Sequence, residues 1–176
     1  MALYFVTGNE EKFREIKQLI PQIEQLDSDL PEIQSLDPEK IIQAKLSEVA
    51  KNKKDQFIVE DTSLFINGMH GLPGPLIKWF SKTVENRGLL KMAKDFGDMT
   101  AKAKVLIGYG DAYDIKFFEG IIMGTIVEPK GGEGFGWDSI FMPQGSQKTF
   151  AQMSLEEKNE YSMRRKAVKK LMSYLK

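Results

Sequence analysis

The sequence predicts an α/β fold with a mixed β-sheet. In the N-terminal part of the chain, short apolar runs typical of buried strands alternate with segments of helical periodicity. Residues 101–109 instead alternate small or apolar with polar side chains, and Gly110-Asp111 then turns the chain into a further strand, as in a meander. Because β-α alternation and hairpins occur in one chain, we expect helices to flank a mixed sheet.

Turn and capping residues divide the chain into elements. Pro21 ends the first helical pattern, and Asp37-Pro38 begins a second helix. Ser154 with Glu157 forms a capping box for a short helix, and Ser162 caps the last helix. Strands are predicted at 3–6, 57–59, 64–66, 101–109, 115–118 and 121–127. The helix after the turn-rich segment 68–75 is expected to end near Gly88 and to bury Leu76, Ile77, Phe80 and Val84.

The composition excludes several classes of protein. Lysine plus arginine and aspartate plus glutamate each number 25, so the chain lacks the net charge expected of a nonspecific nucleic-acid binder. There is no cysteine and only one histidine, His70, which excludes disulfides, cysteine nucleophiles and multi-histidine metal sites. Any metal would be held by oxygen atoms, which favours magnesium, calcium or manganese.

No apolar run is long enough to span a bilayer, and no linker divides the chain. We therefore expect a single domain over residues 1–176, located in the cytoplasm and without a membrane partner.

The segment Thr7-Gly8-Asn9-x-x-Lys12 lies between the first strand and the first helix. Glycine lets backbone N–H groups approach an anion, the helix start contributes positive potential, and Lys12 adds a full charge. The segment is compatible with phosphate binding, and equally with a turn at Gly8 and a helix cap at Asn9. It is not a P-loop, because GxxxxGK[ST] is absent.

Two further polar groups follow apolar segments. Glu60-Asp61-Thr62 is expected at the end of the strand at 57–59, a usual position for a functional carboxylate in α/β sheets, although solvated strand ends share the pattern. Lys78 lies near a helix start, where a lysine opposes the helix dipole and suggests a nearby anion. The alternative is a surface lysine beside a packed tryptophan, Trp79.

The segment Phe135-Gly136-Trp137-Asp138 places two aromatic residues around a glycine, ahead of an acid. Such a segment can stack a nucleobase and hydrogen-bond its edge, or its two rings can alternate into a core. Lys158-Asn159 and Ser162-Met163-Arg164-Arg165 place cations around the junction of the last two helices, which taken alone indicates a solvated surface.

Together these motifs resemble the inosine triphosphate pyrophosphatase family of house-cleaning hydrolases. The similarity rests on the order and spacing of the motifs, and it extends from the first strand to the last helix. The segments that carry it are Thr7-Gly8-Asn9-x-x-Lys12, Leu30-Pro31-Glu32, Glu60-Asp61-Thr62, Gly71-Leu72-Pro73-Gly74-Pro75-x-Ile77-Lys78-Trp79-Phe80, Phe135-Gly136-Trp137-Asp138, Thr149-Phe150-Ala151-x-Met153 and Glu157-Lys158-Asn159-x-x-Ser162-x-Arg164.

The resemblance implies an elongated α/β domain with a long mixed sheet, two lobes around a central cleft, and a homodimer. It also implies hydrolysis of noncanonical purine nucleoside triphosphates (ITP, dITP, XTP) to the monophosphate and pyrophosphate, with Mg²⁺. A triphosphate carries about four negative charges, so its site needs cations, together with carboxylates that hold a metal and orient water.

The resemblance also assigns roles to residues of this chain. Asp61 would be the general base and, with Glu32, a magnesium ligand. The predicted phosphate contacts are Thr7, Gly8, Asn9, Lys12, Lys45, Thr62, Lys78 and Lys158. The residues predicted to hold the base or read its edge are Phe135, Gly136, Trp137, Asp138 and Arg164.

The chain departs from the family pattern at Met163, where the family has a histidine. Methionine cannot donate the hydrogen bond that histidine offers to the 6-oxo group of a purine. We expect catalysis to survive and base selectivity to be weakened or altered. The alternatives are therefore the same reaction with relaxed base specificity, and a nucleotide-binding module without turnover, against which Glu32 and Asp61 argue.

Overall fold

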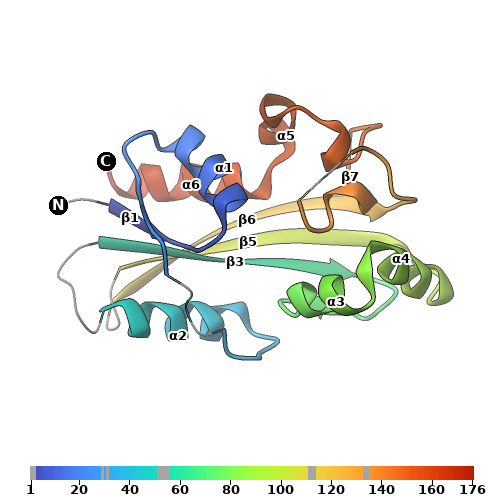
Figure 1. The fold of residues 1–176 in the computed structure, drawn as a ribbon, viewed down its shortest axis with the longest axis horizontal. Helices are drawn as coiled ribbons and strands as arrows, with labels where there is room; N and C mark the ends of the chain where they lie inside the picture. The colour runs from blue at the N-terminus through green and yellow to red at the C-terminus, as the bar shows by residue number, and fades with distance from the viewer. Residues whose placement is uncertain (1–2, 29, 31, 51–55, 111–113, 133–134) are drawn as a thin grey trace. The chain divides into compact units, whose positions relative to one another are not determined.

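The computed structural model describes residues 3–28, 30, 32–50, 56–110, 114–132 and 135–176 (Figure 1). Pro31 of the predicted motif and the predicted turn residue Asp111 lie outside the described residues. The helices are α1 (Glu10–Leu19), α2 (Pro38–Ala50), α3 (Ile77–Thr83), α4 (Glu85–Asp95), α5 (Leu155–Tyr161) and α6 (Met163–Tyr174). The strands are β1 (Leu3–Val6), β2 (Glu24–Leu26), β3 (Gln56–Ile66), β4 (Pro73–Gly74), β5 (Thr100–Gly110), β6 (Ile115–Ile126) and β7 (Phe141–Pro143). Short 3₁₀ helices are η1 (Asp138–Ile140) and η2 (Phe150–Gln152).

Within the described residues, the strands form one seven-stranded sheet in the order β2-β1-β3-β5-β6-β7, with β4 paired to β3. Strand β1 is parallel to β2 and to β3, with Tyr4 opposite Glu24 and Phe57. The pairs β3–β4 and β6–β7 are antiparallel. The predicted α/β fold with a mixed sheet is therefore confirmed. Across the described ranges, no helix combines the length and apolarity needed to cross a bilayer.

The chain divides into two compact units, and the boundaries between them fall within β3, β5 and β6 and after the first residue of α6. The first unit comprises Met1–Asp61, Val105–Gly120 and Arg164–Lys176, and the second comprises Thr62–Lys104 and Ile121–Met163. In the first unit, α2 covers one face of the sheet, and α1 and α6 cover the other (Figure 1).

The core of the first unit attaches α2 to the sheet. Alternate β3 residues Phe57 and Val59 pack with Ile42 and Leu46 of α2, and Val6 of β1 completes the contact. Full burial of each such side chain stabilises the fold by about 1.5–3 kcal/mol. Successive strand residues point to opposite faces of the sheet. Ile58 and Glu60 therefore point toward α1 and α6.

Strand β3 corrects one prediction. The sequence analysis ended a strand at Glu60-Asp61-Thr62 and began another at residue 64, whereas β3 is a single strand of 11 residues. Both Glu60 and Asp61 are buried within it, and the charge of Glu60 is met by Lys12 and Arg164. Likewise, β6 is one strand where two were predicted, and the three-residue strands β2 and β7 were not predicted.

The helix predicted to end near Gly88 is in fact two helices, α3 and α4. The chain turns between them at Glu85, whose φ of 57° is left-handed. Gly88 lies inside α4, where a Cβ would approach the Cβ of Val84 to 2.7 Å. Val84 is 40% exposed, so the prediction that it is buried was also wrong. The predicted capping box is confirmed: Ser154 Oγ accepts from the Glu157 N–H at 3.2 Å.

Candidate active site

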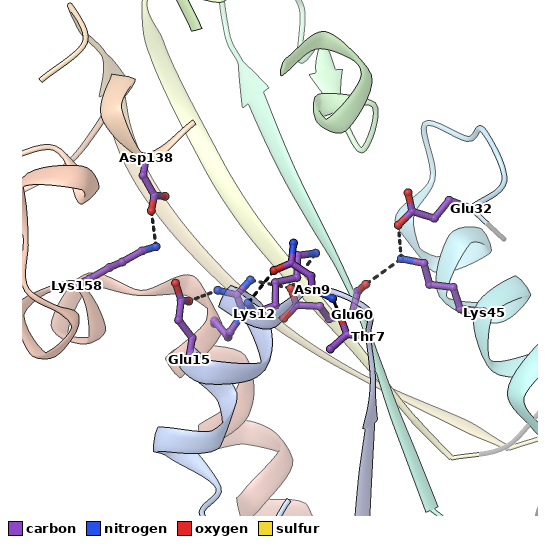
Figure 2. A network of polar contacts seen from close by, with 10 residues as sticks. Thr7, Asn9, Lys12, Glu15, Glu32, Lys45, Glu60, Asp138 and Lys158 are labelled. Carbon is purple, nitrogen blue, oxygen red and sulfur yellow. Dashed lines mark hydrogen bonds and ion pairs between the residues drawn. The ribbon is translucent and has the colours of Figure 1, made fainter. Parts of the chain in front are cut away.

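The loop between β1 and α1 holds Lys12 toward the middle of β3. Asn9 Oδ1 accepts a hydrogen bond from the Lys12 N–H at 3.0 Å, and the Asn9 N–H donates to Thr7 Oγ1 at 3.1 Å. Asn9 is therefore the cap of α1, one of the two roles that its sequence position allowed. Lys12 Nζ lies 3.2 Å from Glu60 Oε1 (Figure 2).

Glu60 is the centre of a buried network of charges. Arg164 donates to it twice, from Nε to Oε2 at 2.8 Å and from Nη2 to Oε1 at 2.7 Å. Arg164 Nη1 also donates to Glu15, a residue that the sequence analysis did not single out. The available signal was helical spacing, since Glu15 lies one turn after Lys12 on α1. Arg164 was predicted to read a base edge, and in this structure three of its nitrogens contact carboxylates.

The contacts of this network shift the pKa values of Glu60 and Arg164 in opposite directions. Burial alone would raise the pKa of Glu60, but Arg164 and Lys12 hold that pKa well below its usual range. Burial would lower the pKa of Arg164, and Glu60 and Glu15 raise it above its ordinary value. The low pKa and the hydrogen bonds from Arg164 make Glu60 a poor proton acceptor, so it is a weak candidate for a general base.

The neighbouring carboxylate points the other way. Because side chains alternate along a strand, Asp61 faces α2 when Glu60 faces α1 and α6. On this face Lys45 Nζ donates to the Glu60 carbonyl oxygen at 3.1 Å and lies 3.2 Å from Glu32 Oε1 (Figure 2). The two predicted metal ligands, Glu32 and Asp61, therefore belong to one face of the first unit, where Lys45 also lies.

This pair of carboxylates fits magnesium. Mg²⁺ is usually bound by one or two protein carboxylates and completes its shell with water and substrate phosphates. Glu32 and Asp61 are the two donors that the sequence predicts. Over the ranges that the structure describes, no group of three or more acidic, histidine or cysteine side chains could hold a metal ion.

In the second unit, Asp138 and Lys158 form a nearly dry ion pair. Lys158 Nζ lies 2.6 Å from Asp138 Oδ2, and both side chains are 9% exposed (Figure 2). Lys158 Nζ also lies 5.4 Å from the centroid of the Phe150 ring. Lys158 was predicted among the phosphate cations, and the structure places it against the residue predicted to read the base edge.

The two predicted base-holding aromatic residues have different surroundings. Trp137 is buried and packs edge-on against Phe141, with ring centroids 5.3 Å apart, and it also contacts Phe150. Phe135 is half-buried, and Gly136 is exposed. Trp137 therefore has a core position, as one of the two sequence interpretations allowed, whereas Phe135 is partly accessible to a ligand.

Comparisons with known proteins cover nearly the whole chain. The model of the Ham1 family matches residues 3–174. The chain belongs to the Ham1 family. It is 41% identical over 179 residues to the inosine triphosphate pyrophosphatase of Schizosaccharomyces pombe, covering 99% of this chain and 95% of that one. The inosine triphosphate pyrophosphatase of Mycosarcoma maydis is 41% identical over 183 residues, covering 99% and 94%.

A solved structure supports the fold of this Ham1-family chain. The Ham1 protein of Staphylococcus aureus has a TM-score of 0.81 at 26% identity, covering 98% of this chain and 97% of that one. The resemblance to the inosine triphosphate pyrophosphatase family is confirmed by these comparisons.

The remaining predicted site residues of this Ham1-family chain lie in the second unit. Lys78 is exposed on the first turn of α3, and Thr62 is half-buried on β3. Trp79, expected to be packed if Lys78 were a plain surface lysine, is 44% exposed. Met163 is 4% exposed, so this departure from the family pattern is an interior side chain.

Proposed function

We propose that this Ham1-family chain hydrolyses noncanonical purine nucleoside triphosphates, such as ITP, dITP and XTP, to the monophosphate and pyrophosphate. The observation that carries the proposal is its 41% identity, over nearly the whole length of both chains, to a protein named inosine triphosphate pyrophosphatase. In the reaction a water molecule attacks the α-phosphorus, its proton passes to a base, and pyrophosphate leaves.

Asp61 is the proposed general base. Glu60, its neighbour, is unsuited because its carboxylate oxygens already bind Arg164 and Lys12. Asp61 points to the α2 face, where Glu32 and Lys45 lie, so its carboxylate can accept the proton of a water held beside the phosphates.

The proposed phosphate cations of the first unit are Lys12 and Lys45. Each is paired with a carboxylate in this structure, Lys12 with Glu60 and Lys45 with Glu32. We infer that phosphate oxygens compete for these ammonium groups when substrate binds. In the second unit, Lys78 and Thr62 are the proposed phosphate contacts. The loop residues Thr7, Gly8 and Asn9 are proposed to lie against the phosphates beside Lys12.

Glu32 and Asp61 are proposed to hold Mg²⁺ together with the substrate phosphates. When bound, the ion would neutralise part of the negative charge of the triphosphate. We further propose a homodimer in the cytoplasm, as the resemblance implies. Light scattering of the purified chain tests the assembly, and cell fractionation tests the location.

The second unit is proposed to hold the base. Phe135 supplies a partly accessible ring, and Gly136 and the buried Trp137 shape the loop behind it. The Asp138–Lys158 pair offers an acceptor and a donor to the polar edge of a purine. Arg164, which was predicted to read the base edge, belongs to the first unit, where it holds Glu60.

Release of pyrophosphate, measured with Mg²⁺ over a panel of nucleoside triphosphates, tests the proposal. Asp61→Asn should lower kcat about 100-fold or more while leaving the fold intact, since a positioned general base contributes about 10²–10⁴-fold. Asp98→Asn is the matched control, because Asp98 is an exposed carboxylate that accepts bonds only within its own turn, from Thr100. Tight nucleotide binding without pyrophosphate release would instead identify a binding module.

A second candidate keeps the reaction and relaxes the choice of base. The observation that favours it is the burial of Met163 in the unit that also holds Asp138 and Lys158. A thioether there offers no hydrogen-bond donor to a 6-oxo group. Turnover of GTP or ATP at rates close to that of ITP would support this candidate.

A further inference from the structure

Asn86, a residue outside the predicted motifs, is tied to the loop proposed to hold the base. Its Nδ2 donates to the carbonyl oxygen of Gly136 at 2.9 Å and to Oγ of Ser139 at 3.0 Å. These partners are 50 and 53 positions away in the sequence. Asn86 is half-buried in the first turn of α4, and all three residues belong to the second unit.

The corner between α3 and α4 determines where Asn86 lies. Glu85, the residue before it, has a φ of 57°, which is uncommon for a residue other than glycine. Val84 and Gly88, which flank Glu85 and Asn86 in the sequence, pack so closely that a Cβ at Gly88 would not fit. Strained backbone of this kind persists where the surrounding structure fixes it. Asn86 thus follows directly on a strained, closely packed corner.

The segment on the other side of the contact is also held by the packing of Trp137, by the Asp138–Lys158 pair and by the bond from the Lys130 N–H to the Ser139 oxygen. Gly136 has a φ of 58°, and a Cβ built there would meet no atom within 4 Å. The local backbone bonds are those of tight turns, from the Asp138 N–H to the Phe135 oxygen at 3.1 Å and from the Ile140 N–H to the Trp137 oxygen at 3.1 Å. Asn86 bonds on both sides of Trp137 and Asp138, and it therefore adds a constraint at Gly136, where a Cβ would meet no neighbour.

We propose that Asn86 is a positioning residue for the base of the substrate. It holds Gly136 and Ser139 so that Phe135 and Asp138 keep the spacing that a purine requires. The inference rests on the proposed function, which assigns the base to this loop. Asn86 contacts no reacting atom in this scheme, so it affects how the base is bound and leaves the hydrolysis step unchanged.

Two variants of Asn86 and one control test this proposal. Asn86→Ala removes both hydrogen bonds, and Asn86→Asp keeps the size of the side chain but loses its N–H donors. Asn67→Ala is the control, because Asn67 Nδ2 also makes a long-range bond, to Thr100 Oγ1 at 2.7 Å, elsewhere in the same unit. We expect KM for ITP to rise about tenfold in both Asn86 variants, with kcat within about twofold of the parent. Inhibition by pyrophosphate, which has no base, should not change.

A normal KM for ITP in folded Asn86→Ala protein would overturn the proposal, even if that protein melted earlier than Asn67→Ala. An equal loss of affinity for pyrophosphate would overturn it as well, since the effect would not be specific to the base. Should Asn86→Ala fail to fold, Ser139→Ala removes one acceptor alone and should raise KM about threefold. If the parent chain releases no pyrophosphate from any nucleotide, it is the proposed function that fails.

Discussion

Arg164 binds Glu60 through two parallel hydrogen bonds, of 2.8 Å and 2.7 Å, across 104 positions of sequence. The side chains are 2% and 1% exposed, so neither charge is solvated by water. The bidentate geometry fixes the start of α6 to the middle of β3. Lys12 and Glu15 of α1 join the same network, which therefore attaches both helices to the strand that carries Asp61.

Glu60→Gln should destabilise the protein strongly. Removal of one partner of a buried ion pair costs about 3–5 kcal/mol, and here Arg164 loses its bidentate carboxylate and keeps its bond to Glu15. Urea unfolding near neutral pH measures this free energy of unfolding. The control is Glu11→Gln, which removes an exposed carboxylate paired with Arg14 and should change stability by less than about 1 kcal/mol. A loss equally small for Glu60→Gln would contradict the prediction.

Glu60→Gln should also make the free energy of unfolding depend less steeply on pH in the acidic range. The pKa of Glu60 is lower in the folded protein than in the unfolded chain. Its stabilisation is therefore fully present above the unfolded pKa of about 4.3, and it is lost as the pH falls below that value toward the folded pKa. Unfolding free energies measured between neutral pH and about pH 3 should fall more steeply for the parent than for Glu60→Gln. Equal slopes would show that Glu60 is not the group responsible.

Lys158→Met should destabilise the second unit by leaving Asp138 buried without its cation, at a cost of about 3–5 kcal/mol. The double variant Asp138→Leu with Lys158→Met removes both charges, and it should recover most of that stability. Nucleotide affinity should stay low in the double variant, since both proposed base contacts are gone. Thermal unfolding and calorimetric titration with ITP separate the two effects. Full affinity in the double variant would remove this pair from the proposed site.

The sequence was sufficient for the elements whose burial follows a simple period. The apolar stripe of α2 and the alternation in β5 identify those elements directly. The sequence did not predict the length of β3. Glu60 and Asp61 interrupt the apolar run in the same way as a solvated strand end would. What keeps Glu60 inside the strand is Arg164, which lies 104 positions away and is invisible to any local pattern.

The candidate site shows the same division. The residue types could be predicted from the motifs and the family resemblance, but the partners of each residue could not. Lys158 was grouped with the phosphate cations by its charge, and the fold pairs it with Asp138. Glu15 and Asn86 were overlooked because their partners, Arg164 and the loop at Gly136, are distant in the sequence.

Glu32→Gln should weaken magnesium binding more than substrate binding. Glu32 is partly exposed and pairs with Lys45, which also donates to the Glu60 carbonyl oxygen, so its loss should cost less stability than the loss of the buried Glu60. A neutral amide is a poorer ligand for Mg²⁺ than a carboxylate, so the magnesium concentration for half-maximal pyrophosphate release should rise about tenfold. Glu48→Gln, on α2 and outside the proposed site, is the control. An unchanged magnesium requirement would show that Glu32 is not a ligand.

Met163→His should sharpen the choice of base. Met163 is an interior side chain of the second unit, and an imidazole there would supply the hydrogen-bond donor that the thioether lacks. A site that hydrogen-bonds a substrate group discriminates against analogues that lack it, so the kcat/KM for ITP relative to ATP should rise about tenfold. Met123→His, which adds the same group at an exposed position on β6, controls for the extra histidine. If both variants keep the parental ratio, Met163 does not contact the base, and the proposed relaxation of specificity has no structural cause at this position.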